Sequence, residues 1–250
     1  MLMDSFHYYR QISNLNDNQI VAIDKGDING DNIIDTVYIV GKKPVDPNIR
    51  YIENIKIIIQ DGKTNKINEI YLKVNSGYNP ELSLVRFSKS SIKQIFISID
   101  SNDEYESRRF YIYSFENNEV KKIFDFEVFN NSYIYDVSFL ENFKVKIISE
   151  KTNKTFVLDI TNKGVTYLSD IYNPDGTLKS KIKGKVIGLN NLYPVDINND
   201  NIFELMAIQR VIGLYPDDVL ATIETPLILK NENFSTQNTQ QFITPYFLNT

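Results

Sequence analysis

The chain carries the acidic loop Asp27-Ile28-Asn29-Gly30-Asp31-Asn32-Ile33-Ile34-Asp35, which runs directly into the apolar stretch Thr36-Val37-Tyr38-Ile39-Val40. A second loop, Asp196-Ile197-Asn198-Asn199-Asp200-Asn201-Ile202-Phe203-Glu204, runs into Leu205-Met206-Ala207-Ile208-Gln209 in the same way. Short apolar runs of this kind, the first strongly β-branched, are typical of buried strands. The recurrence of this loop-and-strand unit predicts an all-β fold.

Both loops have the composition of a calcium site. Oxygen-bearing side chains occupy loop positions 1, 3, 5 and 9, and Ca²⁺ takes six to eight oxygen ligands, one of which is usually the backbone carbonyl of position 7. We expect the first loop to bind more tightly, because it has Gly30 for the turn and the compact Asp35 as its last ligand. The predicted Ca²⁺ ligands are Asp27, Asn29, Asp31, the Ile33 carbonyl and Asp35 in the first loop, and Asp196, Asn198, Asp200, the Ile202 carbonyl and Glu204 in the second.

The loops have two other possible interpretations. An EF-hand needs Glu at position 12 and flanking helices, whereas position 12 is Tyr38 in one copy and Ala207 in the other. A turn rich in Asp and Asn that binds no metal remains the alternative, because these residues favour turns on their own. The acidic run Asp100–Glu106 has irregular spacing, and we interpret it as a solvated loop.

Composition narrows the class of protein. The chain has 250 residues, no Cys and a formal net charge of −5. Disulfides and thiol chemistry are therefore excluded, and a nucleic-acid partner is not favoured. No apolar run approaches the length of a membrane span, and the first residues lack the pattern of a signal peptide.

The order of strand and turn signals predicts an antiparallel array. Turn pairs such as Asp61-Gly62 and Asp175-Gly176 separate short strand candidates. No strand is predicted between Val74 and Ile92, and helix is expected in under about a tenth of the chain. Units that begin near residues 27, 86, 141 and 196 predict four to five antiparallel blades in a β-propeller-like array with calcium-loop insertions. We expect residues 20–250 to form this single domain, after a partly irregular segment at residues 1–19.

The loop-and-strand unit resembles the FG-GAP/VCBS-type repeat of calcium-binding β-propellers. The likeness rests on Gly26–Val37, and a wider similarity to VCBS-repeat proteins of spore-forming Firmicutes covers most of residues 20–235. It departs at Arg86–Gln94, where Arg86, Ser88 and Ser90 replace an acidic loop. The resemblance implies that alternate acidic positions bind Ca²⁺ on a blade. It brings no established activity with it.

These observations lead to an expected function. No nucleophile elbow, phosphate-binding glycine loop or metalloprotease helix occurs, and Asp217-Asp218 is interpreted as an ordinary turn. We expect a non-enzymatic, calcium-binding protein with a binding or structural role, and with a protein or glycan as its partner. A glycan-acting hydrolase or lyase on the same scaffold is the alternative. The expected location is cytoplasmic or spore-associated, unless an export signal has been removed.

Overall fold

A computed structural model describes residues 18–46, 49–103, 108–236 and 239–246. Most of the predicted N-terminal segment, residues 1–17, lies outside these ranges, as do Glu104–Glu106 of the acidic run. Residues 18 and 19 already belong to the first strand. Within these ranges no helix reaches the length and apolar character needed to cross a membrane.

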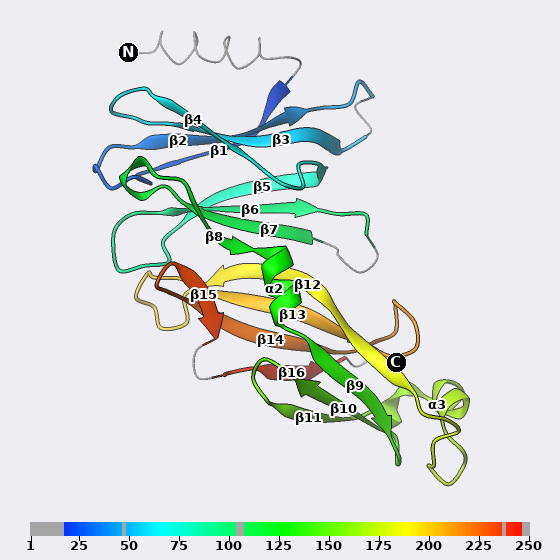
Figure 1. The fold of residues 1–250 in the computed structure, drawn as a ribbon. Helices are drawn as coiled ribbons and strands as arrows, with labels where there is room; N and C mark the ends of the chain where they lie inside the picture. The colour runs from blue at the N-terminus through cyan, green and yellow to red at the C-terminus, as the bar shows by residue number, and fades with distance from the viewer. Residues whose placement is uncertain (1–17, 47–48, 104–107, 237–238, 247–250) are drawn as a thin grey trace.

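The described residues form two eight-stranded antiparallel sheets, so the all-β prediction is confirmed (Figure 1). The first sheet has the order β1-β2-β3-β5-β6-β7-β8, with β4 also paired to β3. Its strands are β1 (Asn18–Gly26), β2 (Asp35–Lys42), β3 (Tyr51–Gln60), β4 (Ile67–Tyr71), β5 (Gly77–Val85), β6 (Gln94–Asp100), β7 (Arg108–Ser114) and β8 (Lys121–Asp125).

The second sheet has the order β11-β10-β9-β12-β13-β14-β15, with β16 also paired to β14. Its strands are β9 (Tyr135–Leu140), β10 (Lys144–Ser149), β11 (Thr155–Asp159), β12 (Lys183–Val195), β13 (Glu204–Ile212), β14 (Val219–Lys230), β15 (Asn233–Thr236) and β16 (Phe242–Pro245).

Helix is confined to short connections in the described part of the chain. The α-helices α2 (Phe126–Ser132) and α3 (Val165–Ile171) have seven residues each, and the 3-10 turns are η1 (Glu116–Asn118) and η2 (Thr161–Lys163). Asp125 caps α2 by accepting a hydrogen bond from the Glu127 N–H at 2.9 Å. The expectation of less than about a tenth helix holds for the residues that the structure describes.

The predicted closed propeller is not what the described residues form. Tyr51 and Ile52 of β3 pair with β5, and Lys183 and Gly184 of β12 pair with β9. Because β3 and β12 are long enough to reach a second unit, neighbouring units join edge to edge into continuous sheets. Strands β1, β8, β11 and β15 end two sheets that each run through more than one unit, whereas each blade of a propeller is a separate four-stranded sheet.

The four residues at which the predicted units begin nevertheless lie in equivalent loops of the fold. Residues 27–34 connect β1 to β2, residues 86–93 connect β5 to β6, residues 141–143 connect β9 to β10, and residues 196–203 connect β12 to β13. In every case the loop joins the first two strands of an antiparallel meander. The spacing therefore located four equivalent connections correctly, although the packing of the units differs from a propeller.

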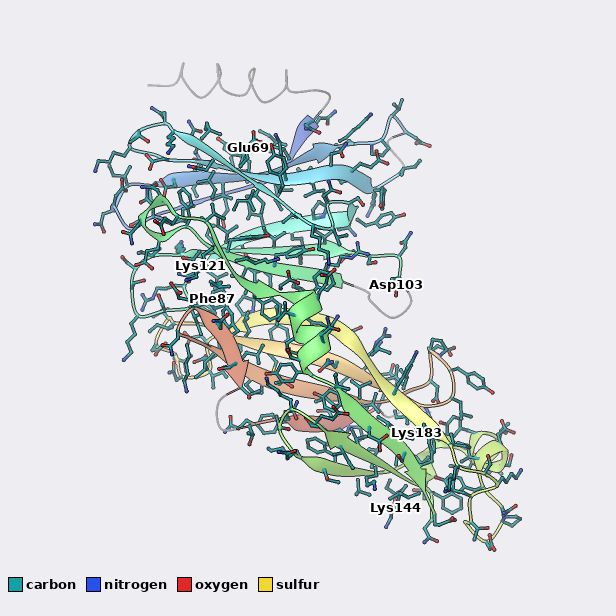
Figure 2. The ribbon with its side chains drawn as sticks, viewed as in Figure 1. Glu69, Phe87, Asp103, Lys121, Lys144 and Lys183 are labelled. Carbon is teal, nitrogen blue, oxygen red and sulfur yellow. The ribbon has the colours of Figure 1, made fainter. Side chains whose placement is uncertain are left out.

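Two hydrophobic cores hold the sheets together. The larger core joins the inner face of the first sheet to one end of β12–β14, including Leu189, Leu205 and Leu227. Phe87, which is labelled in Figure 2, lies in this core. Its ring meets that of Phe234 edge to face, with ring centroids 5.1 Å apart. The smaller core lies between the other end of β13 and β14, strands β9–β11 and α3. Helix α2 lies at the junction between the two sheets (Figure 1).

Candidate functional site

The first acidic loop is folded around its own backbone N–H groups. Asp27 accepts hydrogen bonds from Gly30 N at 2.7 Å and Asn32 N at 3.0 Å. Asn32, at position 6, has φ of 64°, a left-handed conformation that Asn tolerates better than most residues other than Gly. The side chain at position 1 is thus turned inward, over the centre of the loop.

The second loop repeats most of this arrangement, although its position-1 carboxylate accepts from position 5 where that of the first loop accepts from position 4. Asp196 accepts from Asp200 N at 3.1 Å and from Asn201 N at 3.0 Å, and Asn201 has φ of 61°. In both loops the position-3 side chain accepts the N–H of position 5, and the position-5 side chain accepts the N–H of position 7. The position-9 carboxylate accepts the N–H of position 2 in both.

The last carboxylate distinguishes the two loops. Asp35 is fully buried and accepts from Ile28 N at 3.1 Å and from Gly62 N at 2.9 Å. Burial raises the pKa of the Asp35 carboxyl, although the two N–H groups oppose this shift. Glu204 is only partly buried and accepts from Ile197 N at 3.2 Å.

The first loop is also bonded to two distant turns. Asn29 donates its side-chain amide to Asp61 at 2.9 Å and to Asn118 at 3.2 Å, and its carbonyl accepts from Asn117 N at 3.0 Å. Burial would raise the pKa of Asp61, but hydrogen bonds from Thr64 and its other neighbours outweigh burial and lower it. The Asp61-Gly62 turn signal was visible in the sequence, but its contact with the loop was not.

The predicted metal ligands are brought together within each loop, but their carboxylates do not converge on one point. Among the described residues, no group of three or more His, Cys, Asp or Glu side chains lies where it could hold a metal ion. In the first loop the ammonium of Lys63 lies 4.0 Å from Asp31, where it competes with any added cation. Calcium binding would therefore require the loop side chains to move inward.

The degenerate loop at residues 86–93 lies between the two acidic loops. Its Lys93 N donates to the Asp27 carbonyl at 3.0 Å, and its Arg86 carbonyl accepts from Phe203 N at 2.8 Å. Ser88 and Ser90 bond to each other at 2.8 Å. Three of the four equivalent connections are thus joined by backbone hydrogen bonds on one side of the molecule.

The other acidic candidates have structural partners. Burial would raise the pKa of Asp100, but the Arg108 guanidinium and Asn79 outweigh burial and lower it. Asp218 forms an ion pair with Lys163 at 2.7 Å and accepts the Tyr167 hydroxyl at 2.6 Å. These contacts give the Asp218 side chain a structural role, so its position does not require a role in acid–base chemistry.

A groove of about 770 Å³ opens where β9 and β12 diverge beside α2. Its walls carry Glu127, which is paired with Lys73 at 2.5 Å. Tyr135 donates to Gln209 at 3.2 Å, and burial raises the pKa of Tyr135 to about 12. The groove therefore offers amide, hydroxyl and paired charged groups, which suit hydrogen bonding to a ligand. No local pattern in the sequence indicates this groove, since it is built from segments distant in the chain.

Comparison with known proteins places the chain in a family. The YybI C-terminal domain family matches residues 133–242, which correspond closely to the second sheet. A protein of Bacillus subtilis (strain 168), described as uncharacterized protein YybI, is 36% identical over 216 residues, covering 86% of this chain and 81% of the relative. No solved structure matches the chain.

These matches correct the resemblance inferred from the loops. The sequence pattern pointed to FG-GAP/VCBS-type repeat proteins, and that assignment is wrong, because the family found is a different one. The error has a physical origin. An acidic, Asn-rich loop that enters a strand follows from local turn chemistry, and such a loop is not specific to one family.

Proposed function

This chain belongs to the YybI family, and we propose that it is a non-enzymatic protein with a binding or structural role, whose acidic loops take up calcium. One observation carries the calcium proposal: the side chains at positions 3, 5 and 9 accept the same backbone N–H groups in the two loops. Each carboxylate offers about four lone-pair sites, so an N–H bond leaves acceptor capacity for a cation.

The hydrogen bonds favour the second loop as the stronger calcium site, in the opposite order to the sequence expectation. Asp35 is buried between Ile28 and Gly62, so moving it toward an ion breaks contacts with β3–β4. Lys63 adds a competing positive charge beside Asp31. Glu204 is more exposed and has a longer side chain, which reaches an ion with less disturbance of the fold.

The binding role is proposed for the groove between β9, β12 and α2. Its amide and hydroxyl groups suit the hydroxyls of a glycan or the backbone of a protein partner. A hydrolase or lyase would use a pair of carboxylates, one of them with a raised pKa. Two carboxylates, Asp103 and Glu127, line this groove, and Glu127 is held by Lys73. Asp35, whose pKa is raised, lies in the loop region and not in this groove. These contacts support binding over catalysis.

The calcium proposal is tested by melting temperature in chelator, in Ca²⁺ and in Mg²⁺. A site filled at 100 times its dissociation constant adds about 2.7 kcal/mol to the free energy of unfolding. We expect Ca²⁺ to raise the melting temperature, and the double variant Asp196→Ala with Asp200→Ala to lose most of that rise.

The matched control is Asp175→Ala. Asp175 is an exposed Asp that accepts hydrogen bonds from Thr177 in a turn outside both loops. It should keep the full calcium response. An equal rise in melting temperature in the control and in the loop variant would show that the second loop is not the site. If Ca²⁺ does not raise the melting temperature of the wild type, the calcium proposal is wrong.

A further inference from the structure

Strands β9 and β12 separate at the groove. The two strands share two residue pairs, the last of which joins Val137 to Gly184. Lys183, which belongs to the other pair, is labelled in Figure 2. Where this register ends, residues 134–135 on the β9 side and residues 185–188 on the β12 side line the groove. The groove therefore lies between two strand edges that have moved apart.

Side-chain amides bond the backbone groups in this gap. The Gln209 amide nitrogen donates to the carbonyls of Tyr133 and Ile187 at 3.5 Å and 3.4 Å, and Asn130 accepts from Leu189 N at 2.7 Å. An ordinary N–H···O hydrogen bond measures about 2.7–3.2 Å. The two bonds from Gln209 are longer than this, so its N–H groups retain the capacity to donate to a closer acceptor.

A chain of hydrogen bonds fixes the direction of the Gln209 amide. Thr152 donates to Gln241 at 2.6 Å, and Gln241 donates to the Tyr135 hydroxyl at 2.7 Å. That hydroxyl donates to the Gln209 side-chain oxygen at 3.2 Å, and Gln209 is only 2% exposed. Because its oxygen is already engaged, Gln209 presents N–H donors to the groove. A ligand bonded there must supply an acceptor oxygen.

The other groups in the lining favour an uncharged ligand that is not a sugar. Phe126 and Tyr133 are 3% and 6% exposed, so neither ring offers an open face on which a sugar could pack. Charges of the two signs are balanced among the described residues of the lining, which include Lys73, Lys185, Asp103 and Glu127.

We propose that the groove takes an extended, uncharged peptide segment, whose backbone carbonyls accept from Gln209 as those of an added strand would. This inference rests on the binding role proposed for the groove and names its ligand class. A peptide backbone carries a donor and an acceptor on each residue other than Pro, which suits the mixture of carbonyl and amide groups in the gap. The groove volume of about 770 Å³ lies within the range of about 300–1,000 Å³ that is usual for ligand sites.

Affinity selection tests the ligand class. The probe is a synthetic library of capped hexapeptides built from Ala, Ser, Thr, Val and Asn, presented to the immobilised full chain, with the uncharged glycan cellohexaose tested in parallel. Gln209→Leu removes the donors with little change in side-chain size. Gln60→Leu, in β3 and outside the groove lining, is the matched control. If Gln209→Leu does not fold, Tyr135→Phe, which releases the Gln209 oxygen, takes its place with the same expectation.

We expect selected hexapeptides to bind the wild type and Gln60→Leu equally, and to bind Gln209→Leu about tenfold more weakly. Methylation of alternate backbone nitrogens in these peptides should also weaken binding. The proposal is overturned if no hexapeptide is selected, or if binding survives either Gln209→Leu or backbone methylation unchanged. Binding of cellohexaose alone, weakened by Gln209→Leu, would refute the peptide assignment and keep the binding role of the groove. If neither probe binds, the binding role of the groove is contradicted as well.

Discussion

The Gly62 N–H donates a hydrogen bond to the Asp35 carboxylate at 2.9 Å, across an interval of 27 residues. Through this contact the end of the first acidic loop is fixed to the turn between β3 and β4. Ile28 N supplies the second hydrogen bond to the same carboxylate. Asp35 therefore holds three segments of the first sheet together, and its substitution should affect stability as well as any metal binding.

Gly62→Ala should destabilise the protein. A Cβ at this position would lie 2.0 Å from the Ile34 carbonyl oxygen, so the turn must move and the bond to Asp35 must lengthen. Overpacking of this kind costs about 1–3 kcal/mol, measured by urea denaturation. Gly26→Ala is the control, since its added Cβ would meet the flexible Lys93 side chain at 3.1 Å. Equal losses in the two variants would contradict a specific role for the Gly62 turn.

Asp35 should make the free energy of unfolding depend on pH in a characteristic way. Its pKa is raised, primarily by burial, so the folded state binds the proton more tightly than the unfolded state. This contribution to stability is present at low pH and is lost as pH rises through the raised pKa. In chelator, the unfolding free energy of the wild type minus that of Asp35→Asn should fall as pH rises above the ordinary titration range of an Asp carboxyl. A difference that grows with pH would show that the ionised carboxylate is the favoured form.

Asn130→Ala should loosen the junction between the sheets. Asn130 lies on α2, and its side-chain oxygen accepts the Leu189 N–H of β12 at 2.7 Å. Its loss leaves a buried donor unpaired, which costs about 1–3 kcal/mol. Hydrogen exchange at Leu189 should quicken accordingly. Asn131→Ala, at the neighbouring exposed position, should leave that exchange rate unchanged, and similar effects in both variants would argue against the contact.

Asn201 tests the conformation of the second loop independently of metal. Its φ is 61°, and the left-handed conformation costs an ordinary L-residue about 1–2 kcal/mol. In chelator, Asn201→Ala should therefore lower the free energy of unfolding by about 1 kcal/mol, whereas Asn201→Gly should be nearly neutral. Equal stabilities of the two variants in thermal or urea unfolding would show that the loop does not hold this conformation.

Local chemistry made part of the fold predictable. Alternating and continuous apolar runs identified most strands, and Asn at position 6 of both loops suits the left-handed backbone found there. Strand β5 was not predicted, because Gly77 and Pro80 signal a turn. The structure accommodates them with a register shift between Tyr78 and Glu81. Helix α2 is too short for its buried Phe126 and Phe129 to give a clear period.

Contacts between distant segments could not be predicted from the sequence. The bonds from Asn29 to Asp61 and Asn118 span 32 and 89 residues, and no local pattern specifies them. The joining of units through β3–β5 and β9–β12 also depends on which strand edges meet in space. For this reason four equivalent loop connections were located correctly, whereas the propeller assembled from them was wrong.

Anomalous diffraction from crystals grown with calcium would test the central proposal most directly. We predict an anomalous peak inside the second loop, contacted by oxygens of Asp196, Asn198, Asp200 and Glu204 and by the carbonyl of Ile202, with a weaker peak or none in the first loop. Crystals that show the second loop well ordered and free of contacts with neighbouring molecules, yet with no calcium peak in either loop, would contradict it. The loops would then be metal-free turns held by their own N–H groups.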